Sequence, residues 1–282
     1  MRGKSFLGLS AAGFHTVAYT EWGPPDATRP VVCVHGLTRN GRDFDPLAAT
    51  LAGTGRRVAC PDVVGRGRSG WLADPMLYGF PQYMADMVAL LARLDTADVD
   101  WVGTSMGGLI GMFLAARPGS PVRRLVLNDV GPLVPKAALE VIAAYVGQAP
   151  AFPDLKAAEG HLRAVHAGFG PLTDAQWRHM AEHGTIRNAD GSYRLAYDPA
   201  IAEPMRAQPA SDVDLWAVWD LIRCPVLVIR GAGSGLLLPE TMAEMSRRGP
   251  KAQIIEVPGC GHAPSLMAED QITPIRDFLN GA

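Results

Sequence analysis

The stretch Gly103-Thr104-Ser105-Met106-Gly107 decides the interpretation of the whole chain, because it fits the pattern G-x-S-x-G. A strand-like run over residues 99–103 precedes it, and a helical pattern over residues 106–116 follows it. This setting predicts a nucleophile elbow, a sharp strand-to-helix turn that lifts the Ser105 hydroxyl out of a sheet. Both glycines are expected because side chains at their positions would collide with neighbouring backbone. The Met106 N–H, at the positive end of the helix, is then placed to hold an oxyanion.

A histidine near the end of the chain has a setting that complements this serine. The sequence Pro258-Gly259-Cys260-Gly261-His262 follows the last expected strand, and its glycines allow a turn that presents the imidazole. In that position His262 is expected to be the general base, which takes the proton of Ser105 and returns it to the leaving group. A nucleophilic serine followed much later by a histidine is also the chain order that goes with a nucleophile elbow.

The loop after the first buried strand is expected to complete the oxyanion site. Residues His35-Gly36-Leu37-Thr38-Arg39 follow the apolar run Val31–Val34. A loop in this place can give a second oxyanion donor, which we assign to the Leu37 N–H. Gly36, Thr38 and Arg39 are expected to bind substrate, and His35 is expected to brace the loop through hydrogen bonds of its ring.

Short β-rich runs alternate with helical patterns along most of the chain. This alternation predicts an α/β fold, a doubly wound and mostly parallel β-sheet with helices on both faces. Strands are expected at residues 15–22, 31–34, 57–60, 99–103, 122–128, 225–230 and 252–257, and helices at 43–52, 83–94, 106–116, 239–247 and 272–279.

The pattern changes between residues 131 and 214, where helical patches and prolines replace it and no clear buried strand is expected. We predict a helical cap at 131–214, inserted into a core domain formed by residues 1–130 and 215–282. Ligands of such sheets bind beyond the carboxyl ends of the strands, so a cap inserted there would cover the site. The predicted cap contains four histidines, of which one could contact substrate: His161, His166, His179 and His183.

The composition excludes several classes of partner. The chain has 282 residues, a net charge of −2 and a pI of about 6.4, so nucleic acids and anionic membrane surfaces are not expected to bind. No apolar run reaches the roughly 20 residues that span a bilayer, and the stretch Phe6–Leu9 is too short for a signal peptide. The cysteines form no C-x-x-C pair, which predicts free thiols in a reducing compartment rather than a zinc site. We expect a cytoplasmic protein with a small-molecule partner and no metal or cofactor, of open oligomeric state.

Taken together, these motifs resemble the α/β-hydrolase superfamily, in particular its capped esterase and C–C hydrolase branch. The resemblance covers nearly the whole chain, and it includes residues 62–69, D-V-V-G-R-G-R-S, which are similar to the family's D-x-x-G-x-G-x-S loop of mainly structural role. It implies a serine hydrolase that cleaves a small carboxylic ester or lactone through an acyl-enzyme on Ser105. Two alternatives stay open: hydrolysis of a carbon–carbon bond in a ring-cleavage product, and a non-catalytic protein that binds a ligand in a hydrolase fold.

The sequence departs from this family's pattern where the third catalytic residue, an acid, is expected. Members of the family usually carry an aspartate in a pattern like G-x-x-S-D, after the strand that corresponds to residues 226–230. In this chain Ser234 is followed by Gly235. The acid orients the imidazole and stabilises the imidazolium, and its loss lowers kcat by about 10⁴ in a serine protease.

Three explanations stay open from the sequence. The acid could be Asp129, directly after the strand at residues 122–128, because some family members carry it one strand earlier. Gly235 could instead mark a lost or mutated aspartate and leave an impaired enzyme. The third source is Glu240 or Glu244, although both fall on the following helix, where they are expected to support its N-terminus and its solvated face.

Overall fold

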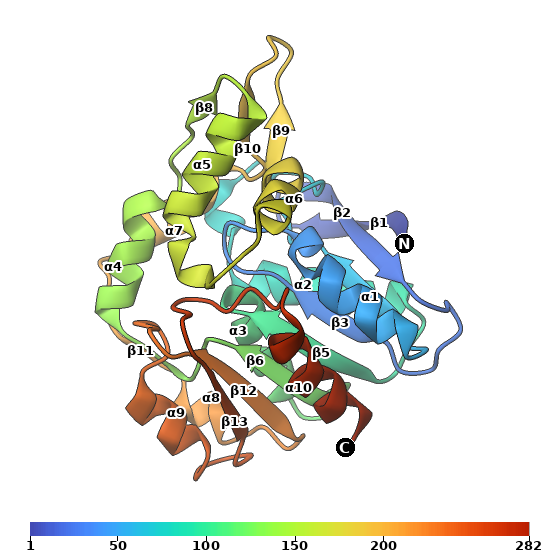
Figure 1. Ribbon diagram of the computed structural model, residues 1–282. Helices are drawn as coiled ribbons and strands as arrows, with labels where there is room; N and C mark the ends of the chain where they lie inside the picture. Colours follow the sequence, from blue (N-terminus) through green and yellow to red (C-terminus); the bar gives the residue numbers. More distant parts are fainter. Residues whose placement is uncertain (282) are drawn as a thin grey trace.

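A central sheet of eight strands organises the computed structural model, which describes residues 1–281 (Figure 1). The strands are β1 (Arg2–Ser10), β2 (Gly13–Trp22), β3 (Val31–Val34), β4 (Val58–Pro61), β5 (Val99–Thr104), β6 (Val122–Asn128), β12 (Val226–Gly231) and β13 (Gln253–Val257). Their order across the sheet is β1-β2-β4-β3-β5-β6-β12-β13. The pairs β1–β2 and β2–β4 are antiparallel, and all other neighbours are parallel. The prediction of a mostly parallel α/β sheet is confirmed.

Helices cover both faces of this sheet, and each face has its own apolar core. The helices α1 (Asp45–Gly53) and α10 (Glu269–Asn280) contribute to the core that contains Val31 and Cys33 of β3. The helices α2 (Phe80–Arg93), α3 (Met106–Ala115), α8 (Trp216–Trp219) and α9 (Pro239–Met245) contribute to the core that contains Val32 and Val34. Alternate residues of β3 thus enter opposite cores, which is why this strand reads as a continuous apolar run.

The first strand differs from the prediction, which placed no strand before residue 15. Residues Arg2–Ser10 form β1 and pair with β2 along their whole length. Exposed and buried residues alternate along β1, but the apolar side chains lie on the exposed side. Leu7 and Leu9 are exposed, whereas Gly8 and Ser10 are buried. An edge strand with apolar side chains on its solvent face lacks the pattern from which strands are predicted.

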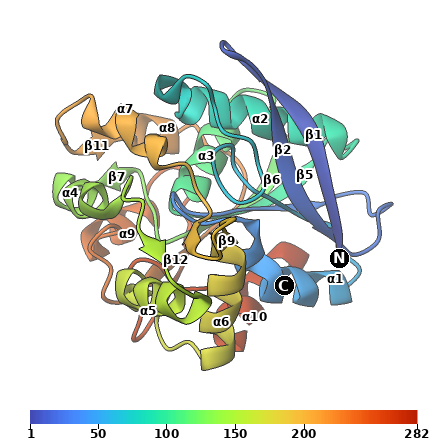
Figure 2. The ribbon, with the colours of Figure 1, turned by 90° about the horizontal axis from the view of Figure 1, so that it is seen from above.

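The inserted segment, residues 131–214, contains short strands as well as helices. Its helices are α4 (Lys136–Tyr145), α5 (Leu155–Val165), α6 (Asp174–Gly184) and α7 (Glu203–Arg206), and Figure 2 shows them in an arc away from β1 and β2. Its strands are β7 (Leu133–Val134), β8 (Ala151–Phe152), β9 (Thr185–Arg187), β10 (Tyr193–Leu195) and β11 (Val213–Asp214). The prediction of a helical segment without a clear buried strand did not include these strands, because strands of two or three residues are too short to show an alternation. β7 pairs with β11, so the two ends of the segment lie side by side.

The structure also shows whether a helix could cross a membrane, and it shows the state of the four cysteines. Within the described residues, no helix combines the length and the apolar character that a membrane crossing requires. Cys33, Cys60 and Cys260 are free and buried, and Cys224 is free and partly buried.

His35 braces the loop that follows β3. Its Nδ1 donates a hydrogen bond to the Gly36 carbonyl oxygen at 2.7 Å, and its Nε2 accepts one from the Val63 N–H at 2.9 Å. The partners fix a neutral ring with its proton on Nδ1, because a second proton on Nε2 would face the Val63 N–H. Burial lowers the pKa of His35 to about 4, so the ring is neutral at pH 7. The expected bracing role of His35 therefore has a physical basis in this loop.

We predict that His35 makes the stability of the fold depend on pH. With a pKa of about 4 in the folded state and about 6.5 in the unfolded state, its contribution is present above pH 6.5 and is lost as the pH falls toward 4, by about 3 kcal/mol in total. Urea unfolding at pH 7, 6 and 5 would measure this loss. A His35→Phe variant should be less stable at pH 7 and should lose less free energy between pH 7 and 5. Equal losses in both proteins would contradict the assignment.

Candidate active site

The turn that carries Ser105 is strained. Ser105 has φ 51° and ψ −114°, a conformation that residues other than glycine rarely adopt. The flanking glycines make it possible: a Cβ on Gly103 would lie 2.3 Å from the Gly107 carbonyl carbon, and a Cβ on Gly107 would lie 2.0 Å from the Val34 carbonyl oxygen. The Ser105 N–H donates to the Asn128 carbonyl oxygen at 3.0 Å. Ser105 thus stands between the carboxyl end of β5 and the first residue of α3, as the pattern of glycines predicts.

His262 reaches Ser105 from the loop that follows β13. Its Nε2 lies 3.0 Å from Ser105 Oγ, a hydrogen-bond distance. The neighbouring Gly261 N–H donates to the Gly168 carbonyl oxygen at 2.7 Å, so the inserted segment helps to hold this loop. The His262 side chain is a quarter exposed, which leaves it accessible to a substrate.

Asp129 extends the chain of hydrogen bonds beyond His262. Its Oδ2 lies 2.7 Å from His262 Nδ1 and accepts a second hydrogen bond from Ser234 Oγ at 2.6 Å. Its Oδ1 accepts from the Gly231 N–H at 2.8 Å. The carboxylate is fully buried, so these donors replace the water that a buried charge would otherwise lose. Asp129 has φ 55°, which aspartate adopts more readily than most residues.

The other positions considered for the acid are 235, 240 and 244, and none of them is in contact with His262 among the hydrogen bonds and ion pairs of residues 1–281. Gly235 is exposed, and a Cβ there would meet no atom within 4 Å, so an aspartate at this position would project toward solvent. Glu240 is exposed in the first turn of α9, and Glu244 pairs with Arg247 at 3.3 Å. Of the three explanations that the sequence leaves open, the geometry favours Asp129.

Two backbone N–H groups near Ser105 are free to donate. Within residues 1–281 the Leu37 N–H has no hydrogen-bond partner, and Met106 is the first residue of α3, so its N–H has no partner inside the helix. The Cβ that Gly36 lacks would lie 3.8 Å from Ser105 Cβ, so the loop after β3 comes close to the serine. Two unpaired N–H groups close to a serine are the donors from which an oxyanion site is built, and their role here is part of the function proposed below.

The sequence does not single out Arg66, which supports the loop after β3 through hydrogen bonds of its side chain. Its side chain is fully buried, and its Nε donates to the Leu37 carbonyl oxygen at 2.9 Å. Its Nη1 donates to the Val64 carbonyl oxygen and to the Tyr83 hydroxyl, at 2.8 and 2.9 Å. These bonds fix the peptide that follows Leu37. Nothing in the sequence distinguishes a fully buried arginine from the solvated arginines that are far more common.

Ser105 lies where two cavities meet, and we call them the polar cavity and the apolar cavity. The polar cavity, of about 60 Å³, is lined by Ser105 and His262 and by all three residues expected to bind substrate, Gly36, Thr38 and Arg39. His166 and Phe169 of the inserted segment also line it. The apolar cavity, of about 520 Å³, shares Ser105 and Leu37 and is otherwise mainly hydrophobic, with side chains that include Phe80, Leu109, Phe113, Val134, Leu139 and Met205.

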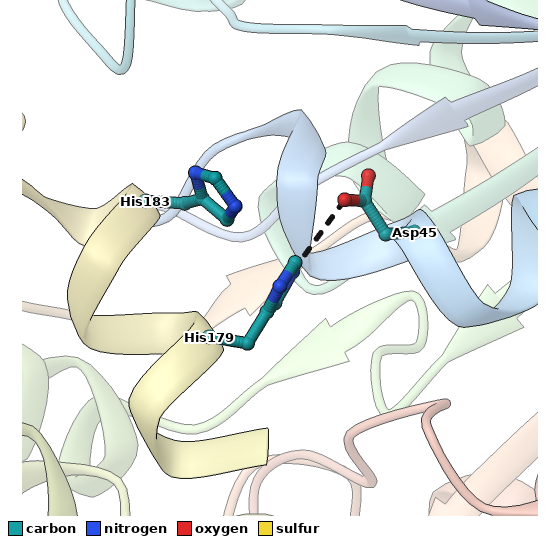
Figure 3. A group of neighbouring side chains, drawn as sticks. All are labelled: Asp45, His179 and His183. Atoms are coloured by element: carbon teal, nitrogen blue, oxygen red, sulfur yellow. Dashed lines mark ion pairs between the residues drawn. The ribbon is translucent and has the colours of Figure 1, made fainter. Parts of the chain in front are cut away.

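Two histidines of the inserted segment, His179 and His183, face the core domain but line neither of the two cavities. His179 and His183 project from one side of α6 toward Asp45 (Figure 3), and His179 Nε2 lies 3.6 Å from Asp45 Oδ2. Such a group could hold a metal ion, but Arg42 Nε already lies 2.9 Å from Asp45 Oδ2. Arg42 Nη1 also lies 3.4 Å from His183 Nδ1. The cluster therefore contains its own cation, and we interpret it as a contact between the inserted segment and the core.

Comparison with known proteins identifies the family of the chain. Residues 31–273 match the alpha/beta hydrolase family. A 3-hydroxybutyrate-oligomer hydrolase from Cupriavidus necator is 49% identical, over 97% of this chain and 96% of that protein. A pimeloyl-[acyl-carrier protein] methyl ester esterase from Neisseria meningitidis is 30% identical, over 91% of this chain and 96% of that protein.

A solved structure gives the same result for the fold. The crystal structure of an alpha/beta hydrolase from Novosphingobium aromaticivorans is 36% identical and superposes with a TM-score of 0.88, over 99% of each chain. The predicted superfamily is thereby confirmed, and so is the prediction that the chain is an enzyme. The chain belongs to the alpha/beta hydrolase family, and it is a hydrolase.

Proposed function

We propose that the chain is a serine hydrolase that cleaves carboxylic esters of short hydroxy acids, with oligomers of 3-hydroxybutyrate as the substrate. The observation that carries the proposal is the unbroken line of hydrogen bonds from Ser105 Oγ through His262 to the buried Asp129. The substrate follows from the similarity to the 3-hydroxybutyrate-oligomer hydrolase, which extends over nearly the full length of both proteins.

The proposed reaction uses these residues in two steps. Ser105 Oγ attacks the ester carbonyl carbon while His262 Nε2 takes its proton, and Asp129 stabilises the resulting imidazolium. The N–H groups of Leu37 and Met106 hold the negative oxygen of the tetrahedral intermediate. Collapse of the intermediate expels the alcohol, which takes its proton from His262. A water molecule then attacks the acyl-enzyme by the same route and releases the acid.

The apolar cavity supports an oligoester as the substrate. An oligomer of 3-hydroxybutyrate carries one methyl group on each unit and has few hydrogen-bond donors, so an apolar cavity of about 520 Å³ beside Ser105 suits it. The inserted segment contributes Leu139 and Met205 to the walls of this cavity, which supports the proposal that residues 131–214 act as a cap over the core domain.

The two alternatives have less support. Hydrolysis of a carbon–carbon bond would use the same serine and histidine, but no residue of the two cavities favours it over ester cleavage. A non-catalytic binding protein was suggested by Gly235, and Asp129 supplies a carboxylate at hydrogen-bond distance from His262 without that position.

We predict that Asp129 is the acid on which turnover depends. An Asp129→Asn variant keeps a residue that tolerates the positive φ, and it should lower kcat on a p-nitrophenyl ester by about 10³- to 10⁴-fold because the imidazolium loses its carboxylate. A Gly235→Asp variant is the matched control and should change kcat/KM less than twofold, since its side chain would face solvent. A gain of several hundredfold in the control would show that the acid belongs at position 235.

We predict that Ser105 forms the acyl-enzyme. A Ser105→Ala variant should lose at least about 10³-fold in kcat on the same ester, because among residues 1–281 no other hydroxyl or thiol lies at hydrogen-bond distance from His262 Nε2. A fluorophosphonate probe should label the unmodified protein and a Ser246→Ala control rapidly, but it should not label the Ser105→Ala variant. Mass spectrometry of the labelled protein would locate the adduct. Full activity in the alanine variant would exclude the proposed mechanism.

A further inference from the structure

The two cavities that meet at Ser105 differ in size and in the groups they offer to a substrate. This inference rests on the proposed ester hydrolysis and concerns the direction in which an oligoester lies across the serine. One cavity is smaller and is lined by one arginine, one aspartate and three histidines (Arg39, Asp43, His35, His166 and His262), whereas the other is larger and mainly apolar. An asymmetric site of this kind can distinguish the two ends of a chain.

Arg39 is the cationic group of the polar cavity. It is only 5% exposed, and its Nε and Nη2 donate to the Asp43 carboxylate at 2.8 and 2.6 Å. This pairing fixes the plane of the guanidinium and uses the edge formed by Nε and Nη2. The remaining nitrogen, Nη1, has no hydrogen-bond partner among residues 1–281. The guanidinium therefore keeps donors for a ligand, although Asp43 already balances its charge.

His166 offers a second polar group in the same cavity. It is 8% exposed, and its ring stacks on Phe169 with centroids 4.6 Å apart. Within the described part of the chain, neither ring nitrogen has a hydrogen-bond partner, and neither is fully buried, so the ring can bond to water or to a ligand. Burial, together with Arg39, lowers the pKa of His166 well below its usual value, so the ring is neutral at pH 7 and has one N–H to donate.

We propose that Arg39 and His166 bind the free carboxylate of the terminal hydroxy acid, so that the enzyme releases single units from the carboxyl end of an oligoester. In an ester of a 3-hydroxy acid, only two carbon atoms separate the ester oxygen from this carboxylate. A carboxylate bound in the polar cavity therefore lies close to Ser105, in the smaller of the two cavities. The rest of the chain lies in the apolar cavity.

In this orientation every bond that forms is matched by a bond that breaks. Ser105 Oγ bonds to the carbonyl carbon of the penultimate unit, and the bond from that carbon to the oxygen of the terminal unit breaks. The terminal unit leaves as a hydroxy acid with the proton from His262, and its carboxylate is unchanged. The remaining acyl chain stays on Ser105 in the apolar cavity until water releases it.

The direction of release can be measured with a trimer of 3-hydroxybutyrate that carries ¹³C in its carboxyl-terminal unit only. Mass spectrometry at less than a tenth of conversion would identify the first products. Release from the carboxyl end gives a labelled monomer and an unlabelled dimer. An unlabelled monomer with a labelled dimer would show release from the hydroxyl end and would overturn the proposal.

The role of Arg39 can be measured as a ratio within each protein, which removes the effect of any general loss of folded enzyme. The unmodified protein should hydrolyse the trimer acid with a kcat/KM about 10- to 100-fold above that of its methyl ester, because a hydrogen-bonded charge is lost in the ester. Arg39→Met should bring this ratio close to one, and His166→Phe, which keeps an aromatic ring against Phe169, should lower it.

A matched control lies in the apolar cavity. Met205→Ala should change kcat/KM for the acid and for the methyl ester by the same factor, and so leave the ratio unchanged. A ratio near one in the unmodified protein, or a ratio that Arg39→Met does not alter, would overturn the carboxylate site. Absence of turnover of both trimers by the unmodified protein would instead contradict the proposed function.

Discussion

A single buried carboxylate organises the site. Asp129 has no contact with solvent, and a charge in that position is stable only if hydrogen bonds replace water. The donors come from three separate places: the end of β12 at Gly231, the loop that follows it at Ser234, and the loop after β13 at His262. This one charge therefore joins the carboxyl ends of β6 and β12 and the loop after β13, at the edge of the sheet where Ser105 lies.

The features that could be predicted from the sequence are those that local sterics determine. The turn at Ser105 requires small residues at fixed distances along the chain, and the glycines before His262 mark a turn in the same way. The choice of the acid could not be decided, because it depends on which carboxylate the pairing of β6 with β12 brings beside the imidazole. β1 was missed since Leu7 and Leu9 face solvent, and the position of His166 depends on the packing of a segment without a regular pattern.

The inserted segment contacts the core in two different ways. At α6, His179 and His183 surround the Arg42–Asp45 ion pair, where the positive charge comes from a side chain. Near the site, the Gly168 carbonyl oxygen accepts from the Gly261 N–H, the residue next to the histidine. The first contact joins surfaces that lie outside both cavities. The second joins the inserted segment directly to a loop that the chemistry needs.

The bond between Gly168 and Gly261 makes the backbone beside His262 depend on the inserted segment. A carbonyl oxygen of that segment holds, at 2.7 Å, the N–H of the residue directly before the imidazole. A substitution that displaces residues 166–170 would therefore act on the imidazole through the main chain, without any change to Ser105, His262 or Asp129. Sequence variation in the inserted segment can thus alter the geometry of the site itself as well as the walls of the two cavities.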